Sequence, residues 1–152
     1  MARVLVPLPD RGYDVTEASV PWRMLTDQGH EVIEWAAIEP SRYAGQSVLH
    51  ASRTTSLTKA QERTAYYLSF WKLGRYYRTY PAYVEDEVKA ALDSESQYLR
   101  GPLALTARGS MTDDRAAFVV EDGRYLSARW PGDAYLFARK LLERLTPATA
   151  PR

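Results

Sequence analysis

Few side chains in this sequence could do chemistry, and they are scattered. The chain has no cysteine, which excludes disulfides, thiolate metal sites and a cysteine nucleophile. The two histidines, His30 and His50, lack the spacing of metal ligands and are interpreted as turn or surface residues. Ser110 and Ser127 lack the Gly-x-Ser-x-Gly context of a serine nucleophile. We therefore predict no metal site and no cofactor.

Glu17 is the remaining candidate for acid–base chemistry. Asp14 or Thr16 is expected to cap a helix, which places Glu17 in the first helical turn. A carboxylate there is stabilised by the helix dipole, so an ordinary structural role is one interpretation. The alternative is a residue of a pocket. The turn glycines Gly12, Gly29 and Gly45 are isolated and form no phosphate-binding loop.

Residues 70–81, FWKLGRYYRTYP, form the densest aromatic and basic run of the chain. Aromatic rings interleaved with arginine can stack on single-stranded nucleic acid. The favoured interpretation is a helix end and loop, with packed rings and guanidiniums stacked on them. The 20 basic and 19 acidic residues leave a net charge of +1, which argues against a nucleic-acid or membrane partner.

The composition is that of a globular protein. With 152 residues, 45% hydrophobic and 26% charged, the chain is expected to form a single domain spanning 1–152. The apolar run Val4–Leu8 is too short for a secretion signal and is interrupted by a proline. No apolar stretch approaches membrane-spanning length. A cytoplasmic location is expected.

The first third of the chain predicts a strand, a helix and a second strand. The strands are expected over 2–8 and 31–37, joined by a helix that ends near Gln28. Gly29 is a suitable helix stop. A right-handed crossover would make the two strands parallel. The predicted inner face of the helix consists of Val20, Met24 and Leu25, and Pro21 would be tolerated only near the first turn.

The middle of the chain predicts two helices. Thr58 and Gln61 form a capping box for a helix that ends at Leu73 and is closed by Gly74. The second helix covers 84–92, with acidic residues favourably placed in its first turn. The predicted inner stripe of the first helix consists of Ala60, Thr64, Tyr67, Leu68 and Trp71.

The end of the chain predicts a β-hairpin followed by a helix. A short strand is expected over 103–106, and the hairpin over 118–129 is indicated by Asp122-Gly123 between β-rich runs. The final helix repeats apolar residues on one face, and the tail 146–152 is expected to fray. That face consists of Ala134, Phe137, Ala138, Leu141, Leu142 and Leu145.

The two ends of the chain resemble the ThiJ/PfpI family of the class I glutamine amidotransferase-like superfamily. The resemblance is carried by VLVPLPDRGYDVTEASVPWRMLTDQGHEVIEWA near the N-terminus and by DGRYLSARWPGDAYLFA near the C-terminus. From Gly45 onward the sequence is similar to the C-terminal half of one bacterial branch. The resemblance implies an α/β fold of a reduced flavodoxin-like, three-layer type, with a mostly parallel sheet and a C-terminal β-hairpin plus helix.

The resemblance does not extend to the central segment of the family. Family members carry a Cys-His-Gly nucleophile elbow between the two halves, whereas this chain passes almost directly from one half to the other, which predicts an internal deletion near 37–46. Glu17 matches the family's carboxyl residue that hydrogen-bonds the cysteine, and here it is interpreted as a relic. The resemblance therefore implies a catalytically inactive ThiJ/PfpI-like protein.

Two alternatives remain open. One is a non-enzymatic oligomerising or small-ligand-binding module, and the other is a residual hydrolase centred on Glu17. Because about three strands leave open sheet edges, the chain is expected to form a homodimer or another homo-oligomer, or to exchange strands with a second copy. A small-molecule ligand is compatible with this scaffold.

Overall fold

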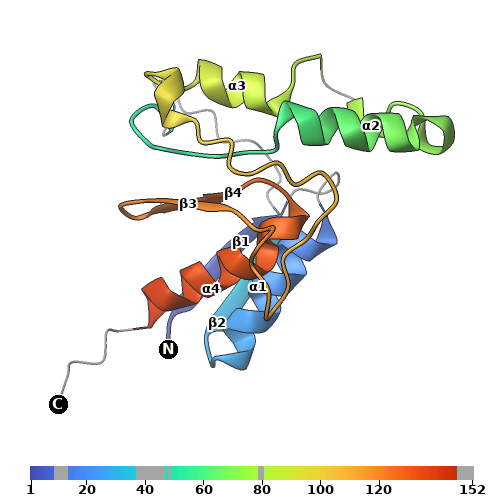
Figure 1. Ribbon diagram of the computed structural model, residues 1–152. Helices are drawn as coiled ribbons and strands as arrows, with labels where there is room; N and C mark the ends of the chain where they lie inside the picture. The colour runs from blue at the N-terminus through green and yellow to red at the C-terminus, as the bar shows by residue number, and fades with distance from the viewer. Residues whose placement is uncertain (9–13, 37–46, 48, 79–80, 147–152) are drawn as a thin grey trace.

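The computed structural model describes residues 1–8, 14–36, 47, 49–78 and 81–146 and has a mixed α/β architecture (Figure 1). The predicted α/β class is therefore confirmed. The junction near 37–46 and the tail beyond Thr146 lie outside the described residues, so the predicted deletion and fraying are not tested. None of the helices in the described part of the chain is both long and apolar enough to cross a membrane.

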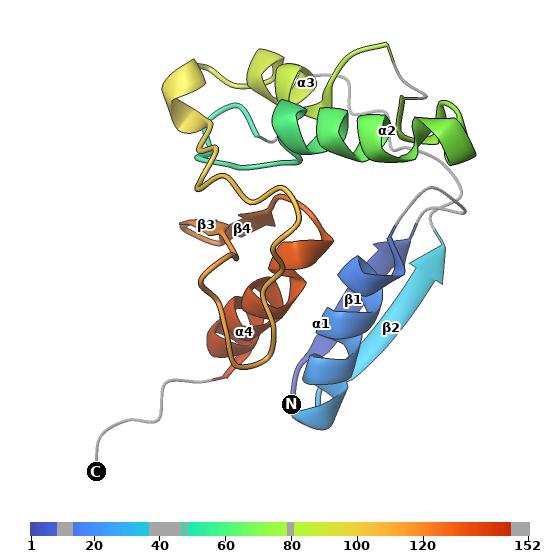
Figure 2. The same cartoon turned by 45° about the vertical axis from the view of Figure 1, so that its right-hand side comes forward.

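The N-terminal unit has the predicted strand–helix–strand order. Strand β1 (Arg3–Leu8) pairs in parallel with β2 (Glu31–Ala36), in a register that places Arg3 opposite Glu31 and Leu5 opposite Ile33. Helix α1 (Val15–Asp27) connects them and begins at Asp14, whose side chain accepts a hydrogen bond from the Thr16 amide. Gly29 follows the helix with φ +76°, a conformation that glycine adopts without strain. Figure 2 shows this unit.

Pro21 lies well inside α1, and the expectation that it would sit near the first turn is wrong. Pro21 is buried together with Ala18, Met24 and Leu25, whereas Val20 is half-buried. Proline has no N–H, so the carbonyl of Glu17 loses its usual helical partner. Burial of the ring in the core offsets part of that cost.

The C-terminal unit consists of a hairpin and the helix that follows it. Strands β3 (Val119–Asp122) and β4 (Tyr125–Ala128) pair antiparallel, and the loop between them is Gly123-Arg124 with Gly123 at φ +55°. The short 3₁₀ helix η3 (Pro131–Asp133) leads into α4 (Ala134–Leu145). The hairpin and terminal helix are confirmed, but residues 103–106 form no strand, so that prediction is wrong.

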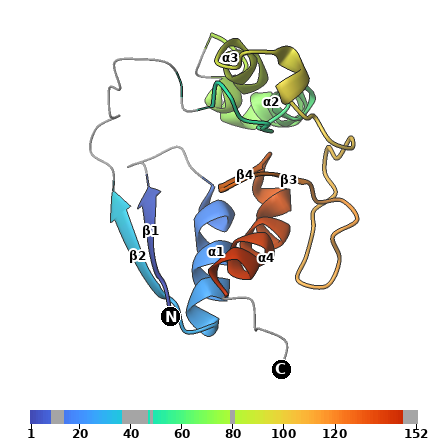
Figure 3. The same ribbon diagram turned by 90° about the vertical axis from the view of Figure 1, so that its left-hand side faces the viewer.

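The two strand pairs form separate sheets. β1 and β2 make one two-stranded sheet, β3 and β4 make another, and no ladder joins them among the described residues. Figure 3 shows α1 between the parallel pair and α4, and α1 packs directly against α4. This arrangement is compatible with an α/β fold, but a single mostly parallel sheet of the flavodoxin-like type is not observed in the described strands.

The middle of the chain lies at one end of the molecule in all three views. It consists of α2 (Lys59–Leu73), α3 (Val84–Ala90) and the 3₁₀ turns η1 (Tyr76–Arg78) and η2 (Glu95–Gln97). The capping box of Thr58 and Gln61 and the closing Gly74, at φ +56°, are both confirmed.

The predicted inner stripe of α2 is wrong. Tyr67, Leu68 and Trp71 are 60%, 65% and 75% exposed, whereas Gln61 and Glu62 are the buried residues of the helix. The buried residues are polar because each has a distant partner. The Gln61 amide donates to the carbonyl of Ala104 over 3.1 Å, and Glu62 accepts from the backbone amide of Val84 over 3.2 Å. Ala60 is exposed and Thr64 half-buried, so neither belongs to a buried stripe.

A buried ion pair joins the hairpin to the final helix. The side chains of Arg129 and Asp133 are 1% and 0% exposed. The Asp133 carboxylate accepts hydrogen bonds from the Phe118 amide and from the Arg129 amide and guanidinium. The guanidinium also donates to the carbonyls of Pro102 and Ala116. Three stretches of chain, around Pro102, Phe118 and Arg129, are thereby held at one point without an unpaired charge.

Candidate functional site

Glu17 lies where the sequence placed it, in the first turn of α1 beyond the carboxyl end of β1. Its backbone amide donates to the carbonyl of Asp14 over 3.0 Å. Ligand sites of open α/β sheets lie beyond the carboxyl ends of the strands, so this is the appropriate end of the sheet for a site. The segments that follow both parallel strands, 9–13 and 37–46, lie outside the described residues.

The pKa of Glu17 is raised from its ordinary value of 4.5. Desolvation of its carboxyl group is the largest cause, followed by the negative charges of Asp14 and then Asp133. The residue as a whole is nevertheless exposed to solvent. A carboxylate dominated by the helix dipole would have a lowered pKa. Desolvation and the two nearby carboxylates thus shift the pKa of Glu17 in the direction opposite to that expected from a helix dipole.

Asp133 does not form a catalytic carboxylate pair with Glu17. Both of its oxygens are engaged by hydrogen bonds from Arg129 and Phe118 at 2.9–3.0 Å. A carboxylate held in this way has no free lone pair directed at a substrate. Its charge reaches Glu17 as a field, and Glu17 is left as a single titratable group. One carboxyl group can exchange a proton, but it does not by itself provide the hydrogen-bond donors of an oxyanion site.

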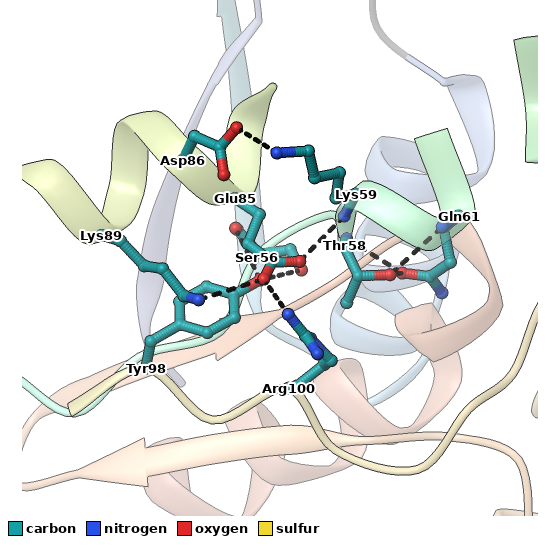
Figure 4. A network of polar contacts seen from close by, with 9 residues as sticks. All are labelled: Ser56, Thr58, Lys59, Gln61, Glu85, Asp86, Lys89, Tyr98 and Arg100. Atoms are coloured by element: carbon teal, nitrogen blue, oxygen red, sulfur yellow. Dashed lines mark hydrogen bonds and ion pairs between the residues drawn. The ribbon is translucent and has the colours of Figure 1, made fainter. Parts of the chain in front are cut away.

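Glu85 lies at the centre of the densest polar network, which Figure 4 shows. The sequence indicated an ordinary first-turn carboxylate of α3, yet the side chain is 2% exposed. Its oxygens accept from the Lys59 backbone amide over 2.9 Å, from Arg100, and from the Lys89 ammonium over 3.2 Å. Nothing in the local pattern marks this role, because Arg100 lies fifteen residues further along the chain.

The network around Glu85 has the properties of an interaction that stabilises the fold, not those of a catalytic site. Desolvation alone would raise the pKa of Glu85, but hydrogen bonds from Arg100, Lys59 and Lys89 outweigh it and lower the pKa below 4.5. The carboxylate is therefore ionised near neutral pH, and its partners saturate it. An acid–base catalyst requires a group that exchanges protons near the working pH, which this one does not.

The histidines and serines occupy structural positions. His30 Nδ1 accepts from the backbone amide of Ala2 over 3.1 Å, and His50 Nε2 lies 3.5 Å from the Asp93 carboxylate. The Ser127 hydroxyl is buried and accepts from the Thr55 amide over 3.1 Å. Ser110 caps its own turn by accepting from the Asp113 amide. In the described part of the chain, no group of three or more His, Asp or Glu side chains could hold a metal ion.

The aromatic and basic run does not pack as expected. Phe70, Tyr76 and Tyr77 are 51%, 60% and 46% exposed, so the prediction of packed rings is wrong for them. Arg78 does stack on a ring, but the ring belongs to Tyr83, which lies outside the run. The result is an exposed aromatic surface on α2 and η1.

Comparisons with known proteins add no assignment. No protein-family model, curated protein or solved structure matches this chain. The resemblance to the ThiJ/PfpI family therefore stays a prediction from the sequence.

Proposed function

We propose that this chain is a ThiJ/PfpI-like α/β protein without the family's cysteine chemistry, and that it serves as a non-enzymatic module which assembles with a second copy of itself. The sequence resemblance motivates the ancestry. The absence of cysteine from these 152 residues supports the loss of the ancestral reaction, since that reaction needs a thiolate. The assembly is motivated by the β1–β2 sheet.

The observation that carries the proposal is an apolar face of the parallel pair that no described part of the chain covers. Leu5 and Ile33 are directly opposite in the ladder and are 58% and 40% exposed. Their neighbours Val4, Val6 and Val32 point to the other face and are half-buried. Parallel sheets are normally covered on both faces, so the face with Leu5 and Ile33 is expected to be covered by another layer.

A second copy of the chain is the occupant that fits this face best. Arg3 and Glu31 lie on the same face as Leu5 and Ile33, two positions along the register, and their side chains form an ion pair of 2.9 Å. Two copies related by a two-fold axis would bring apolar pairs together and could exchange these opposite charges at the rim. The exposed face of each parallel pair would then be covered by the sheet of the other copy.

The oligomeric state tests the proposal. Sedimentation equilibrium is expected to give a dimer for the wild type and a monomer for the double variant Leu5→Lys/Ile33→Lys, with unchanged circular dichroism. Met111→Lys is the matched control, because Met111 is 62% exposed and lies in a loop outside the strands. A folded wild-type monomer, or dissociation by the control as well, would overturn the assembly.

A second candidate function is a residual hydrolase that uses Glu17, and the raised pKa of that carboxyl favours it. A raised pKa extends the pH range over which a carboxyl group can donate a proton. Esterase, amidase and glyoxalase assays distinguish the two candidates. Turnover by the wild type that is lost in Glu17→Gln would establish the hydrolase, whereas equal and negligible rates in both proteins support the non-enzymatic module.

A further inference from the structure

A pocket of about 260 Å³ lies on the part of the molecule formed by α2 and η1. Its walls come from the outer face of α2, from η1 and its preceding residue, and from the residue that caps α3. It is lined by Arg63, Tyr66, Tyr67, Arg75, Arg78 and Tyr83. Three guanidiniums and three phenols thus surround one small cavity, without a lining carboxylate among the described residues.

One of the three arginines is held in place by the protein. The Arg78 guanidinium lies 3.3 Å from a Glu62 carboxylate oxygen and stacks over the Tyr83 ring, 4.0 Å from its centroid. Glu62 is itself buried and fixed by the Val84 backbone amide. The fork of Arg78 is therefore oriented before any ligand arrives, which reduces the entropy lost on binding.

The positive charges of the other two arginines have no ion-pair partner among the described residues. Arg63 and Arg75 are exposed and make no ion pair with any residue of the described ranges. Like charges gathered around a small cavity repel one another, and an anion placed between them removes that repulsion. Guanidinium groups match phosphate and carboxylate oxygens in pairs.

The tyrosines give the pocket a second preference. The Tyr66 and Tyr67 rings meet edge to face, with centroids 5.4 Å apart, and Tyr83 supplies a third ring beneath Arg78. Flat aromatic walls favour a ligand with a planar ring. The volume lies just below the common range of about 300–1,000 Å³ for small-molecule sites, which suits a compact compound.

We propose that this pocket binds a small phosphate monoester that carries a planar ring. The phosphate would lie among the guanidiniums of Arg63, Arg75 and Arg78, and the ring would lie against Tyr66 and Tyr67. The pocket is formed by α2 and its neighbours, whereas the proposed assembly uses β1 and β2. Binding can therefore be present or absent whatever the oligomeric state proves to be.

Isothermal titration calorimetry of the full chain with four probes tests the ligand class. Phenyl phosphate is expected to bind more tightly than glycerol phosphate, and inorganic phosphate more weakly than either, because each step removes contacts with the rings or the pocket walls. Phenol, which has no phosphate, is expected not to bind. Absence of binding by all three phosphates, or equal binding by phenol and phenyl phosphate, would overturn the proposal.

Variants locate the binding. Arg63→Gln and Arg75→Gln each remove one charge from a surface side chain and are expected to weaken phenyl phosphate binding about tenfold or more, as the loss of one charged hydrogen bond predicts. Arg124→Gln is the matched control, since Arg124 is exposed at the hairpin tip. Equal weakening by all three variants would show a general charge effect and refute the site.

A ring variant separates the two parts of the pocket. Tyr67→Leu is expected to lower the affinity for phenyl phosphate while leaving that for inorganic phosphate unchanged, because the phosphate contacts only the guanidiniums. Loss of both affinities to the same extent, or of neither, would contradict the proposed placement of the ring.

Discussion

Replacing Asp133 with alanine tests the claim that one buried ion pair holds the C-terminal unit together. The variant removes the acceptor of four hydrogen bonds, three of them from Arg129 and one from the Phe118 amide, at 2.9–3.0 Å. It also leaves the Arg129 guanidinium, 1% exposed, without its counter-charge. Breaking such a pair costs about 3–5 kcal/mol of unfolding free energy, because an uncompensated charge stays buried.

The unfolding free energy lost on breaking this buried pair is expected to be much larger than the loss for a surface ion pair. Arg23 and Asp27 form an exposed ion pair on α1, with side chains that are 71% and 48% exposed. Removing its charge by Arg23→Met is expected to cost about 0.5 kcal/mol or less. Comparing the two variants separates burial from ion pairing as such, since both pairs have the same i, i+4 spacing.

Urea denaturation at neutral pH, followed by far-UV circular dichroism, measures these costs. Because a loss of this size is a large part of the stability of a domain, Asp133→Asn provides a milder variant that keeps one acceptor oxygen. The double variant Asp133→Ala/Arg129→Met is expected to be more stable than Asp133→Ala alone, because it removes the stranded charge. A cost below about 1 kcal/mol for Asp133→Ala, or a double variant less stable than either single one, would refute the reasoning.

Two further predictions concern Glu85 and Gly101. The pKa of Glu85 in the folded protein is below its ordinary value of 4.5. The stability that its charge contributes is therefore fully present above pH 4.5 and is lost as the pH falls through the folded-state pKa. In urea unfolding at a series of pH values, the greater stability of the wild type over Glu85→Gln is expected to disappear in acid. An unchanged advantage at low pH would contradict the assigned ionisation. Gly101→Ala would place its Cβ 2.5 Å from the Phe118 ring at φ +68°, whereas Gly29→Ala meets open space at φ +76°. The contact is expected to make Gly101→Ala the more destabilising by about 1–3 kcal/mol in thermal or urea unfolding, and equal losses would show that the backbone angle alone decides.

Local signals in the sequence predicted most element boundaries. The capping box of Thr58 and Gln61 and the positive φ of Gly29 and Gly74 involve residues close together in the chain, so their chemistry is readable without the fold. The hairpin was predicted for the same reason, although the turn proved to be Gly123-Arg124. That placement puts the glycine at the first loop position, which alone needs a positive φ.

The faces of the elements could not be predicted in the same way. The stripe expected on α2 is exposed because Gln61 and Glu62 find partners in Ala104, Arg78 and Val84, and those partners make burial of polar side chains favourable. A helical repeat shows which residues share a face, but it does not show which face meets the rest of the chain.

Some features of the candidate site could likewise be predicted from the sequence, whereas others depend on the tertiary structure. The sequence alone determined that no thiol is available, and its capping signal placed Glu17 in the first turn of the helix that follows the first strand. The tertiary structure decided that desolvation, followed by the charges of Asp14 and Asp133, raises the pKa of Glu17. It also decided that Asp133 and Glu85 are buried and paired, and that Arg63, Arg75 and Arg78 share one pocket. The physical reason is that composition and spacing fix which groups exist, whereas burial and long-range neighbours set their charge, exposure and partners.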